Sequence, residues 1–182
     1  MNFSPFPILE TNRLLLRSLK ESDCNVIFYL RSNAKVNQFI KRPKPENIDD
    51  ALAFINKIKK NVSNNECIYW CITLKDNPNL IGTISLWNFS EDRKTAEVGY
   101  DLHPDFHKKG IMKEALQTVL NFGFNSLNFE TIEAFTQKNN TNSIKLLTNN
   151  NFIHIKNRKD KGNLYNHIFT LQKRNFNLSQ HL

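Results

Sequence analysis

The sequence predicts an α/β fold in which a mixed sheet carries helices on its faces. Several short segments alternate apolar and polar residues, which is typical of strands, whereas others repeat apolar residues at helical spacing. The two kinds of segment follow one another along the chain, so we expect them to pack together as layers. The chain has 182 residues, 40% of them hydrophobic, which is enough for a full core. We therefore expect a single domain over residues 1–182.

The first third of the chain is expected to form one strand and two helices. Residues 14–17, Leu-Leu-Leu-Arg, have the apolar character of a short strand. Residues 21–31 and 49–62 place apolar side chains at helical spacing, which predicts two helices. Prolines at positions 43 and 45 break the chain between them.

Three strands are expected in the middle of the chain. Residues 67–74 and 80–89 are apolar and rich in β-forming side chains, and the Asp-Asn-Pro-Asn sequence at 76–79 predicts a turn between them. Residues 95–102 alternate strictly. One face of this strand is expected to carry Ala96, Val98, Tyr100 and Leu102, and the other Glu97, Gly99 and Asp101.

The last third is expected to form two helices and three strands. Residues 110–124 have the apolar rows of a helix, and residues 131–136 resemble a short strand. Asn140 can cap a further helix, which the asparagines at 149–151 can stop, since Asn tolerates the left-handed conformation. Two closing strands are predicted at residues 152–156 and 164–172.

The composition excludes several classes of protein. No apolar run approaches the roughly 20 residues of a membrane span, and residues 1–7 lack the pattern of a secretion signal, so we expect a cytoplasmic protein without a membrane partner. The three cysteines, Cys24, Cys67 and Cys71, lack the spacing of metal ligands and are expected to be free thiols. We therefore expect no metal site.

The net charge of +8 raises the question of nucleic-acid binding. The basic residues are scattered over several short groups instead of following one face, and no aromatic motif for stacking RNA bases is present. We do not expect direct nucleic-acid binding, and an RNA-binding protein that uses its basic surface is kept as the alternative from another class.

A strand, a short basic loop and the start of a helix follow one another over residues 96–116. The first N–H groups of a helix lack partners within the helix, and its dipole adds partial positive charge there, so this arrangement can hold a pyrophosphate. Gly110 lets the backbone approach a ligand closely, and Lys108 and Lys109 can add charged contacts. The alternative is an ordinary solvated turn, because neither a P-loop nor a dinucleotide-binding glycine motif is present.

The chain resembles the GNAT superfamily of N-acetyltransferases, and within it the branch that acetylates the N-termini of ribosomal proteins. Six segments in the family's order carry the resemblance: Leu-Glu-Thr-Asn-Arg-Leu-Leu-Leu-Arg at 9–17, Leu-Ile-Gly-Thr-Ile-Ser-Leu at 80–86, Ala-Glu-Val-Gly-Tyr at 96–100, Gly-Ile-Met-Lys-Glu-Ala at 110–115, Asn-Thr-Asn-Ser at 140–143 and Asn-Phe at 151–152. The resemblance implies a GNAT fold with a mostly antiparallel sheet of about six to seven strands and about four helices.

The resemblance also implies acetyl-CoA as the acetyl donor. The family's pyrophosphate loop falls on His107, Lys108, Lys109, Gly110, Ile111 and Met112, of which His107 and Met112 depart from the usual motif. The strand at 98–103 would pair through its backbone with the pantetheine arm, so Tyr100 and Leu102 are expected to bind the cofactor. Asn140 and Ser143 match the family's Asn-x-x-Ser segment next to the cofactor.

Two residues are candidates for proton transfer. Glu97 is the candidate general base, because an amine must be neutral before it attacks a thioester; Glu133 and Asp101 compete for this role, and an ordinary surface glutamate is the alternative. Ser143 is the candidate proton donor to the leaving thiolate, or simply a helix-start hydroxyl. Relatives often carry a Tyr for this role at the position of Leu147.

Together these features predict direct acetyl transfer to a primary amine without an acyl-enzyme. The expected acceptor is the N-terminal amine of a ribosomal or other protein; the alternatives are a small-molecule amine (an antibiotic, a polyamine or an amino sugar) or a non-catalytic CoA-binding sensor. We expect Trp70 and Trp87 to pack in the core or beside the acceptor, and the loop around Arg42 to cover it. The protein is expected to be a monomer or a homodimer.

Overall fold

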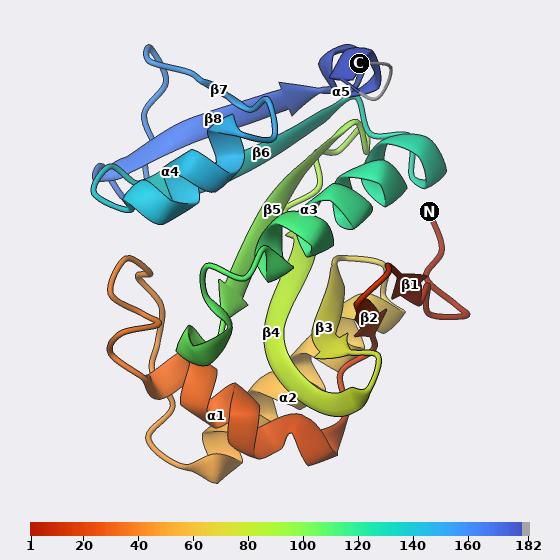
Figure 1. Cartoon of the computed structure of the whole chain (residues 1–182), viewed down its shortest axis with the longest axis vertical. Coiled ribbons are helices and arrows are strands. Elements are labelled where there is room, and N and C mark those ends of the chain that lie inside the picture. Colours follow the sequence, from red (N-terminus) through yellow and green to blue (C-terminus); the bar gives the residue numbers. More distant parts are fainter. Residues whose placement is uncertain (180–182) are drawn as a thin grey trace.

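One sheet runs through the part of the chain that the computed structural model describes, residues 1–179 (Figure 1). Its strands are β1 (Leu9–Glu10), β2 (Leu14–Arg17), β3 (Ile68–Leu74), β4 (Asn77–Trp87), β5 (Thr95–Leu102), β6 (Thr131–Gln137), β7 (Ile153–His154) and β8 (Asn166–Gln172). Their order across the sheet is β1-β2-β3-β4-β5-β6-β8-β7. Only β5 and β6 are parallel neighbours; the other pairs are antiparallel. The predicted mixed, mostly antiparallel sheet is confirmed.

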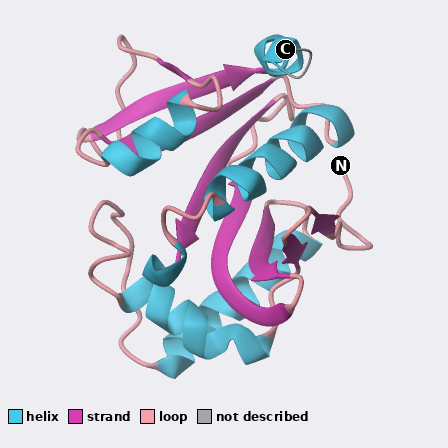
Figure 2. Cartoon of the chain, in the orientation of Figure 1, coloured by secondary structure: helices cyan, strands magenta, loops and turns pink. Residues whose placement is uncertain are grey.

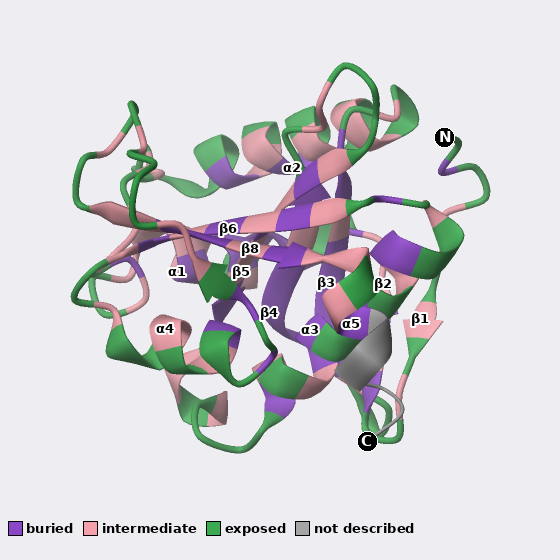
Figure 3. Ribbon diagram, turned by 90° about the horizontal axis from the view of Figure 1, so that it is seen from above, coloured by how far each residue is buried: buried purple, intermediate pink, exposed green. Residues whose placement is uncertain are grey.

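The α-helices cover both faces of this sheet (Figure 2). They are α1 (Cys24–Ser32), α2 (Ile48–Ser63), α3 (Ile111–Asn121), α4 (Thr141–Thr148) and α5 (Lys173–Ser179). Helices α1 and α2 bury Ile27 and Ile55 in one apolar cluster, on the opposite side of the sheet from α3 and α4 (Figure 3). The short helical turns η1 (Glu21–Asp23), η2 (Pro104–Phe106) and η3 (Phe122–Ser126) lie beside the longer helices.

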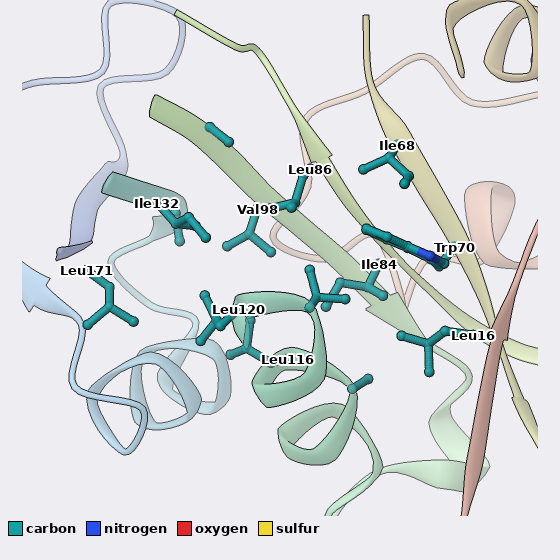
Figure 4. Close-up of a cluster of buried hydrophobic side chains, with 14 of the residues drawn as sticks. Leu16, Ile68, Trp70, Ile84, Leu86, Val98, Leu116, Leu120, Ile132 and Leu171 are labelled. Carbon is teal, nitrogen blue, oxygen red and sulfur yellow. The ribbon is translucent and has the colours of Figure 1, made fainter. Parts of the chain in front are cut away.

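The larger core lies between the sheet and α3 (Figure 4). Trp70 of β3 is completely buried there, and its Nε1–H donates to the carbonyl of Pro7 at 2.8 Å. Leu116 and Leu120 of α3 meet Ile84 of β4 and other strand residues in the same cluster. The alternation predicted for residues 95–102 places β5 against this core. Every second side chain, from Ala96 through Val98 and Tyr100 to Leu102, belongs to the core or packs against it.

The parallel pair β5–β6 opens into a split. Its register joins Thr95 to Thr131, Ala96 to Ile132 and Glu97 to Glu133, and it ends there although both strands continue. Beyond Glu97 the two strands diverge like the arms of a V (Figure 1). The second half of β5 therefore has β4 on one edge and no strand on the other.

Several boundaries differ from those expected, for local reasons. The turn between β3 and β4 is Lys75–Asp76 instead of 76–79, because Leu74 pairs with Asn77 and strand pairing resumes at once. Phe152 is not in a strand, because its N–H donates to the Leu147 carbonyl and so belongs to the end of α4. The two-residue strand β1 and the helix α5 were not predicted, which brings the sheet to eight strands and the α-helices to five in the described residues.

Candidate active site

The free edge of β5 carries backbone groups that face the split. His103 N–H donates to the Ile81 carbonyl at 2.8 Å, so this pair is a hydrogen-bonded pair of the β4–β5 ladder. In an antiparallel ladder such pairs alternate with pairs whose backbone groups point outward. The N–H and C=O groups of Val98, Tyr100 and Leu102 consequently point away from β4, toward the split. An extended ligand with amide groups can bond to them as an added strand would.

The start of α3 lies directly after this strand and offers unpaired N–H groups. Among residues 1–179, the N–H groups of Ile111, Met112 and Lys113 have no hydrogen-bond partner. Gly110 precedes them with φ of 75°, a left-handed conformation that a side chain would strain. A helix start of this kind, at the end of the free strand edge, can bind an anion, and the predicted pyrophosphate site at this position stays a prediction.

Contacts from Arg13, which immediately precedes β2, hold this loop in place. Arg13 donates through Nη1 to the Lys109 carbonyl at 3.0 Å and forms an ion pair with Glu114 of α3 at 2.6 Å. His107 turns back instead of toward the helix start, with Nε2 3.0 Å from the Leu102 carbonyl. The cradle for an anion therefore consists of the backbone and the neighbouring lysines, and His107 fixes the loop to the end of β5.

The first turn of α4 faces β5. Asn140 caps this helix by accepting the Ser143 N–H at 3.2 Å, as the sequence predicted. The Ser143 hydroxyl lies 2.8 Å from the Tyr100 hydroxyl. Leu147, at the position where relatives often carry Tyr, is fully buried in the apolar core.

The opposite face of the sheet carries the three candidate bases, Glu97 and Asp101 on β5 and Glu133 on β6, which differ in their partners. Asp101 accepts hydrogen bonds from Thr83 at 2.7 Å and from Arg42 at 3.0 Å. Glu133 forms a two-pronged ion pair with Arg158 from the loop between β7 and β8. Glu97, at the point where the split begins, has only an amide donor, Asn88 Nδ2, at 3.3 Å. Glu97 is thus the one of the three carboxylates without a cationic partner.

The surroundings of Glu97 favour its protonated form. Burial is the main cause, and the nearby carboxylates of Asp160 and Glu133 add to it, while the Asn88 hydrogen bond opposes it. Together they raise the pKa of the Glu97 carboxyl from 4.5 to about 7. A carboxylate with that pKa is ionised in about half of the molecules at neutral pH and can accept a proton there.

An exposed indole lies beside Glu97. Trp87 is the cross-strand partner of Glu97 on β4, so both side chains project from the same face. Trp87 is 45% exposed, and its Nε1 lies 3.5 Å from the place that a Cβ on Gly99 would occupy. The indole therefore extends over Gly99, and of the two tryptophans Trp70 is in the core whereas Trp87 lies beside the candidate base.

The loop between α1 and α2 is tied to β5 by Arg42. This guanidinium bonds to Asp101, to the Asn37 side chain at 2.7 Å and to the Leu30 carbonyl at 3.0 Å. The side chains of Arg42 and Asp101 are 18% and 6% exposed. The pair therefore fixes the loop against the sheet at the end of β5 that carries the free edge.

Arg42→Ala is expected to lower the free energy of unfolding by about 3 kcal/mol, because it leaves the buried Asp101 carboxylate without its cation. Urea unfolding measures the change. Lys59→Ala, which removes an exposed ion pair with Glu21, is the matched control and should cost less than about 1 kcal/mol. Equal effects of the two substitutions would show that Arg42 does not anchor the loop.

The cysteines are unsuited to carry an acyl group. Cys24, Cys67 and Cys71 are buried and free. Burial raises the pKa of all three thiols, that of Cys67 to about 11, so they stay protonated at neutral pH. Among residues 1–179, no group of three His, Cys, Asp or Glu side chains is arranged to hold a metal ion.

Some residues of this site were not predicted from the sequence. Asn88 and Asp160 lie near Glu97, Arg158 pairs with Glu133, and Thr83 donates a hydrogen bond to Asp101. Only Asn88 had a local signal, since it immediately follows a strand that ends next to Glu97 in the sheet. The other contacts depend on long-range packing.

A split sheet whose free strand edge leads to the unpaired N–H groups of a helix start can hold a long phosphate-bearing ligand. Residues 13–153 match the family model described as Acetyltransferase (GNAT) domain. The chain belongs to this family, and it is an acetyl-CoA-dependent acetyltransferase.

Individual relatives agree with this assignment. The uncharacterized N-acetyltransferase YoaA of Bacillus subtilis (strain 168) is 32% identical over 142 residues, which are 78% of this chain and 80% of that protein. FdhC, described as a nucleotide-linked sugar GNAT, is 26% identical with a TM-score of 0.80, over 100% of this chain and 96% of that one. RimL, the ribosomal L7/L12 α-N-protein acetyltransferase in complex with coenzyme A, shares the fold with a TM-score of 0.79 at 16% identity, over 91% and 98% of the two chains.

Within residues 1–179, no helix is both long and apolar enough to cross a membrane.

Proposed function

We propose that this chain transfers the acetyl group of acetyl-CoA directly to a primary amine, with Glu97 as the general base. The observation that carries this proposal is the position of Glu97: a carboxylate without a cationic partner, with a pKa raised to about 7, at the point where β5 and β6 part. Direct transfer is supported by the three cysteines, which are buried thiols without a role as nucleophile.

The residues of the split fit acetyl-CoA. The free N–H groups of Ile111, Met112 and Lys113, behind Gly110, suit its pyrophosphate, and Lys108 and Lys109 lie in the same loop. The outward backbone groups of Tyr100 and the N–H of Leu102 suit the amides of the pantetheine arm, whereas the Leu102 carbonyl already lies 3.0 Å from His107 Nε2. Asn140 and Ser143 lie at the first turn of α4, opposite Tyr100. When bound, acetyl-CoA supplies the acetyl group as an activated thioester.

The reaction needs a neutral amine nitrogen. Glu97 in its ionised form takes a proton from the incoming amine, directly or through one water, which frees the nitrogen lone pair for attack. Ser143 gives a proton from Oγ to the leaving sulfur. Asp101 and Glu133 are less suited as bases, because each carboxylate is already engaged in an ion pair, with Arg42 and Arg158 respectively.

We infer that the acceptor amine is the N-terminus of a ribosomal or other protein. The six sequence segments that resemble the ribosomal-protein branch support this choice. The net charge of +8 also suits an acceptor carried on an acidic protein or on the ribosome.

A second acceptor, an amino sugar linked to a nucleotide, is favoured by one specific observation. The exposed face of Trp87 beside Glu97 is suited to stack against a sugar ring whose amine reaches the carboxylate. FdhC, the relative described as a nucleotide-linked sugar GNAT, is 26% identical to this chain, and the match covers the whole of this chain.

A panel of acceptors tests the proposal and separates the two candidates. Release of the CoA thiol from acetyl-CoA is followed with peptides bearing free N-termini, with nucleotide-linked amino sugars and with polyamines. Turnover with peptides alone supports the first acceptor, and turnover with amino sugars alone supports the second. Tight CoA binding with no turnover on any amine would contradict the proposed function and indicate a sensor.

Trp87→Ala is expected to raise KM for the acceptor by about tenfold, because it removes the apolar surface next to the base. The KM for acetyl-CoA should change less than twofold, since the cofactor groove lies on the other side of β5. Steady-state kinetics with each substrate varied in turn measures both. An increase in the KM for acetyl-CoA alone would assign Trp87 to the donor side.

A further inference from the structure

We propose that Tyr100 positions the Ser143 hydroxyl and keeps it supplied with a proton during acetyl transfer. The inference rests on the proposed function. It gives a role to the side chain of Tyr100, a residue that was expected to act through its backbone alone. Tyr100 would act through Ser143, without touching the reacting atoms itself, and is therefore a positioning residue.

The two hydroxyl groups come from opposite sides of the split and meet across it. Tyr100 lies on the half of β5 that has no β6 partner, and Ser143 lies in the first turn of α4. Their oxygens are 2.8 Å apart, and neither hydroxyl has another hydrogen-bond partner among residues 1–179. The Ser143 backbone is fixed separately, because its N–H is held by Asn140. Both ends of this contact are thus ordered by secondary structure.

The direction of the hydrogen bond follows from acidity. A phenol is more acidic than an aliphatic hydroxyl, so Tyr100 is the better donor and Ser143 Oγ the acceptor. Burial raises the pKa of the Tyr100 hydroxyl to about 12, so it holds its proton at neutral pH. With Tyr100 as donor, the hydrogen of Ser143 is free to point at a second acceptor.

The proton transfers balance without another reactant. Glu97 takes a proton from the attacking amine nitrogen as the N–C bond forms. Ser143 Oγ gives its proton to the leaving sulfur as the C–S bond breaks, and it takes the Tyr100 proton in the same step. Water then returns a proton to Tyr100 Oη and removes one from Glu97. A serine alone would have to become an alkoxide at this point, whereas the pair leaves the charge on a phenol, which is more acidic.

The kinetic test compares Tyr100→Phe, Ser143→Ala and the double variant. Tyr100→Phe removes one oxygen and keeps the ring, so kcat should fall by about ten- to a hundredfold while KM for acetyl-CoA changes less than twofold. Because the two residues act as a unit, the double variant should be no slower than the slower single variant. Tyr165→Phe, which removes the hydroxyl of an exposed tyrosine in the loop before β8, is the matched control.

Two binding and stability measurements accompany the kinetics. Each single variant should lower the melting temperature by about 2–4 °C and the double variant by no more, if the hydroxyls bond to each other. The Kd for CoA, measured by calorimetry, should stay within twofold of wild type. If the wild type turns over and Tyr100→Phe has the same kcat, this inference is overturned while the proposed function stands. Independent losses that multiply, or a loss confined to KM, would also overturn it, whereas a wild type inactive on every amine would overturn the proposed function as well.

Discussion

Glu97→Gln is expected to lower kcat by about a hundred- to a thousandfold near neutral pH, with little change in the Kd for acetyl-CoA. Glutamine has nearly the same size as glutamate and can still accept the hydrogen bond from Asn88, but it cannot take a proton from the amine. The carboxyl lies on the face of β5 opposite the core and α3, so its replacement leaves the cofactor groove intact. Steady-state kinetics and calorimetric titration with acetyl-CoA measure the two effects.

The pH dependence of the wild type follows from the same carboxyl. Glu97 must be ionised to act as a base, and its pKa is raised to about 7 in the ligand-free protein, so kcat/KM should rise with pH up to about 7 and then level off. This limb should be absent in Glu97→Gln. Glu91→Gln, at an exposed position outside the site, is the matched control and should retain the wild-type profile. An unchanged kcat in Glu97→Gln would remove this residue from the mechanism.

Unfolding measurements separate a catalytic loss from a folding defect. The pKa of Glu97 is higher in the folded protein than its value of 4.5 in an unfolded chain, so ionisation of this group opposes folding. The stabilising effect of Glu97 protonation on the folded state is complete below about pH 4.5 and is lost as the pH rises through about 7. Glu97→Gln should therefore raise the melting temperature relative to wild type, and more at pH 8 than at pH 5.

Gly110→Glu is expected to abolish measurable binding of CoA in a folded protein. Gly110 has φ of 75°, and a Cβ there would lie 3.4 Å from Arg13 Nη2, so any side chain is strained and close to the arginine that holds the loop. A carboxylate at this position would also repel the pyrophosphate from the free N–H groups of Ile111, Met112 and Lys113. Calorimetry with CoA, together with the circular dichroism spectrum, measures binding and folding.

Two further variants control for strain and for charge. Gly110→Ala adds the backbone strain without the charge, and it should weaken CoA binding far less than Gly110→Glu does. Gly162→Glu adds the same charge in an exposed loop at a glycine without a positive φ, and it should bind CoA as the wild type does. If Gly110→Glu kept wild-type affinity, the assignment of the α3 start to the pyrophosphate would be wrong.

Local signals were enough to predict much of the fold. The alternation at residues 95–102 predicted the bounds and the faces of β5, and the helical rows after Gly110 predicted α3. The cap formed by Asn140 followed from residue type alone. Two-residue strands such as β1 have too few residues for any periodicity, which is why they were not predicted.

The choice among candidate bases could not be made from the sequence, because it depends on distant partners. Asp101 is neutralised by Arg42, which is 59 residues away along the chain, and Glu133 by Arg158, which is 25 residues away. The hydroxyl pair of Tyr100 and Ser143 joins residues 43 positions apart. None of these contacts has a sequence periodicity, since each arises from the packing of separate elements around the split in the sheet.

The most direct measurement is an NMR titration of the glutamate side-chain carboxyls in the ¹³C-labelled protein, with Glu97→Gln used to assign the Glu97 signal. It tests whether the Glu97 carboxyl can exchange a proton near neutral pH. The Glu97 carboxyl should titrate with a pKa of about 7, because burial and the nearby carboxylates disfavour its charge. A Glu97 signal that titrates near the ordinary value of 4.5 would contradict its role as the base at the start of the split.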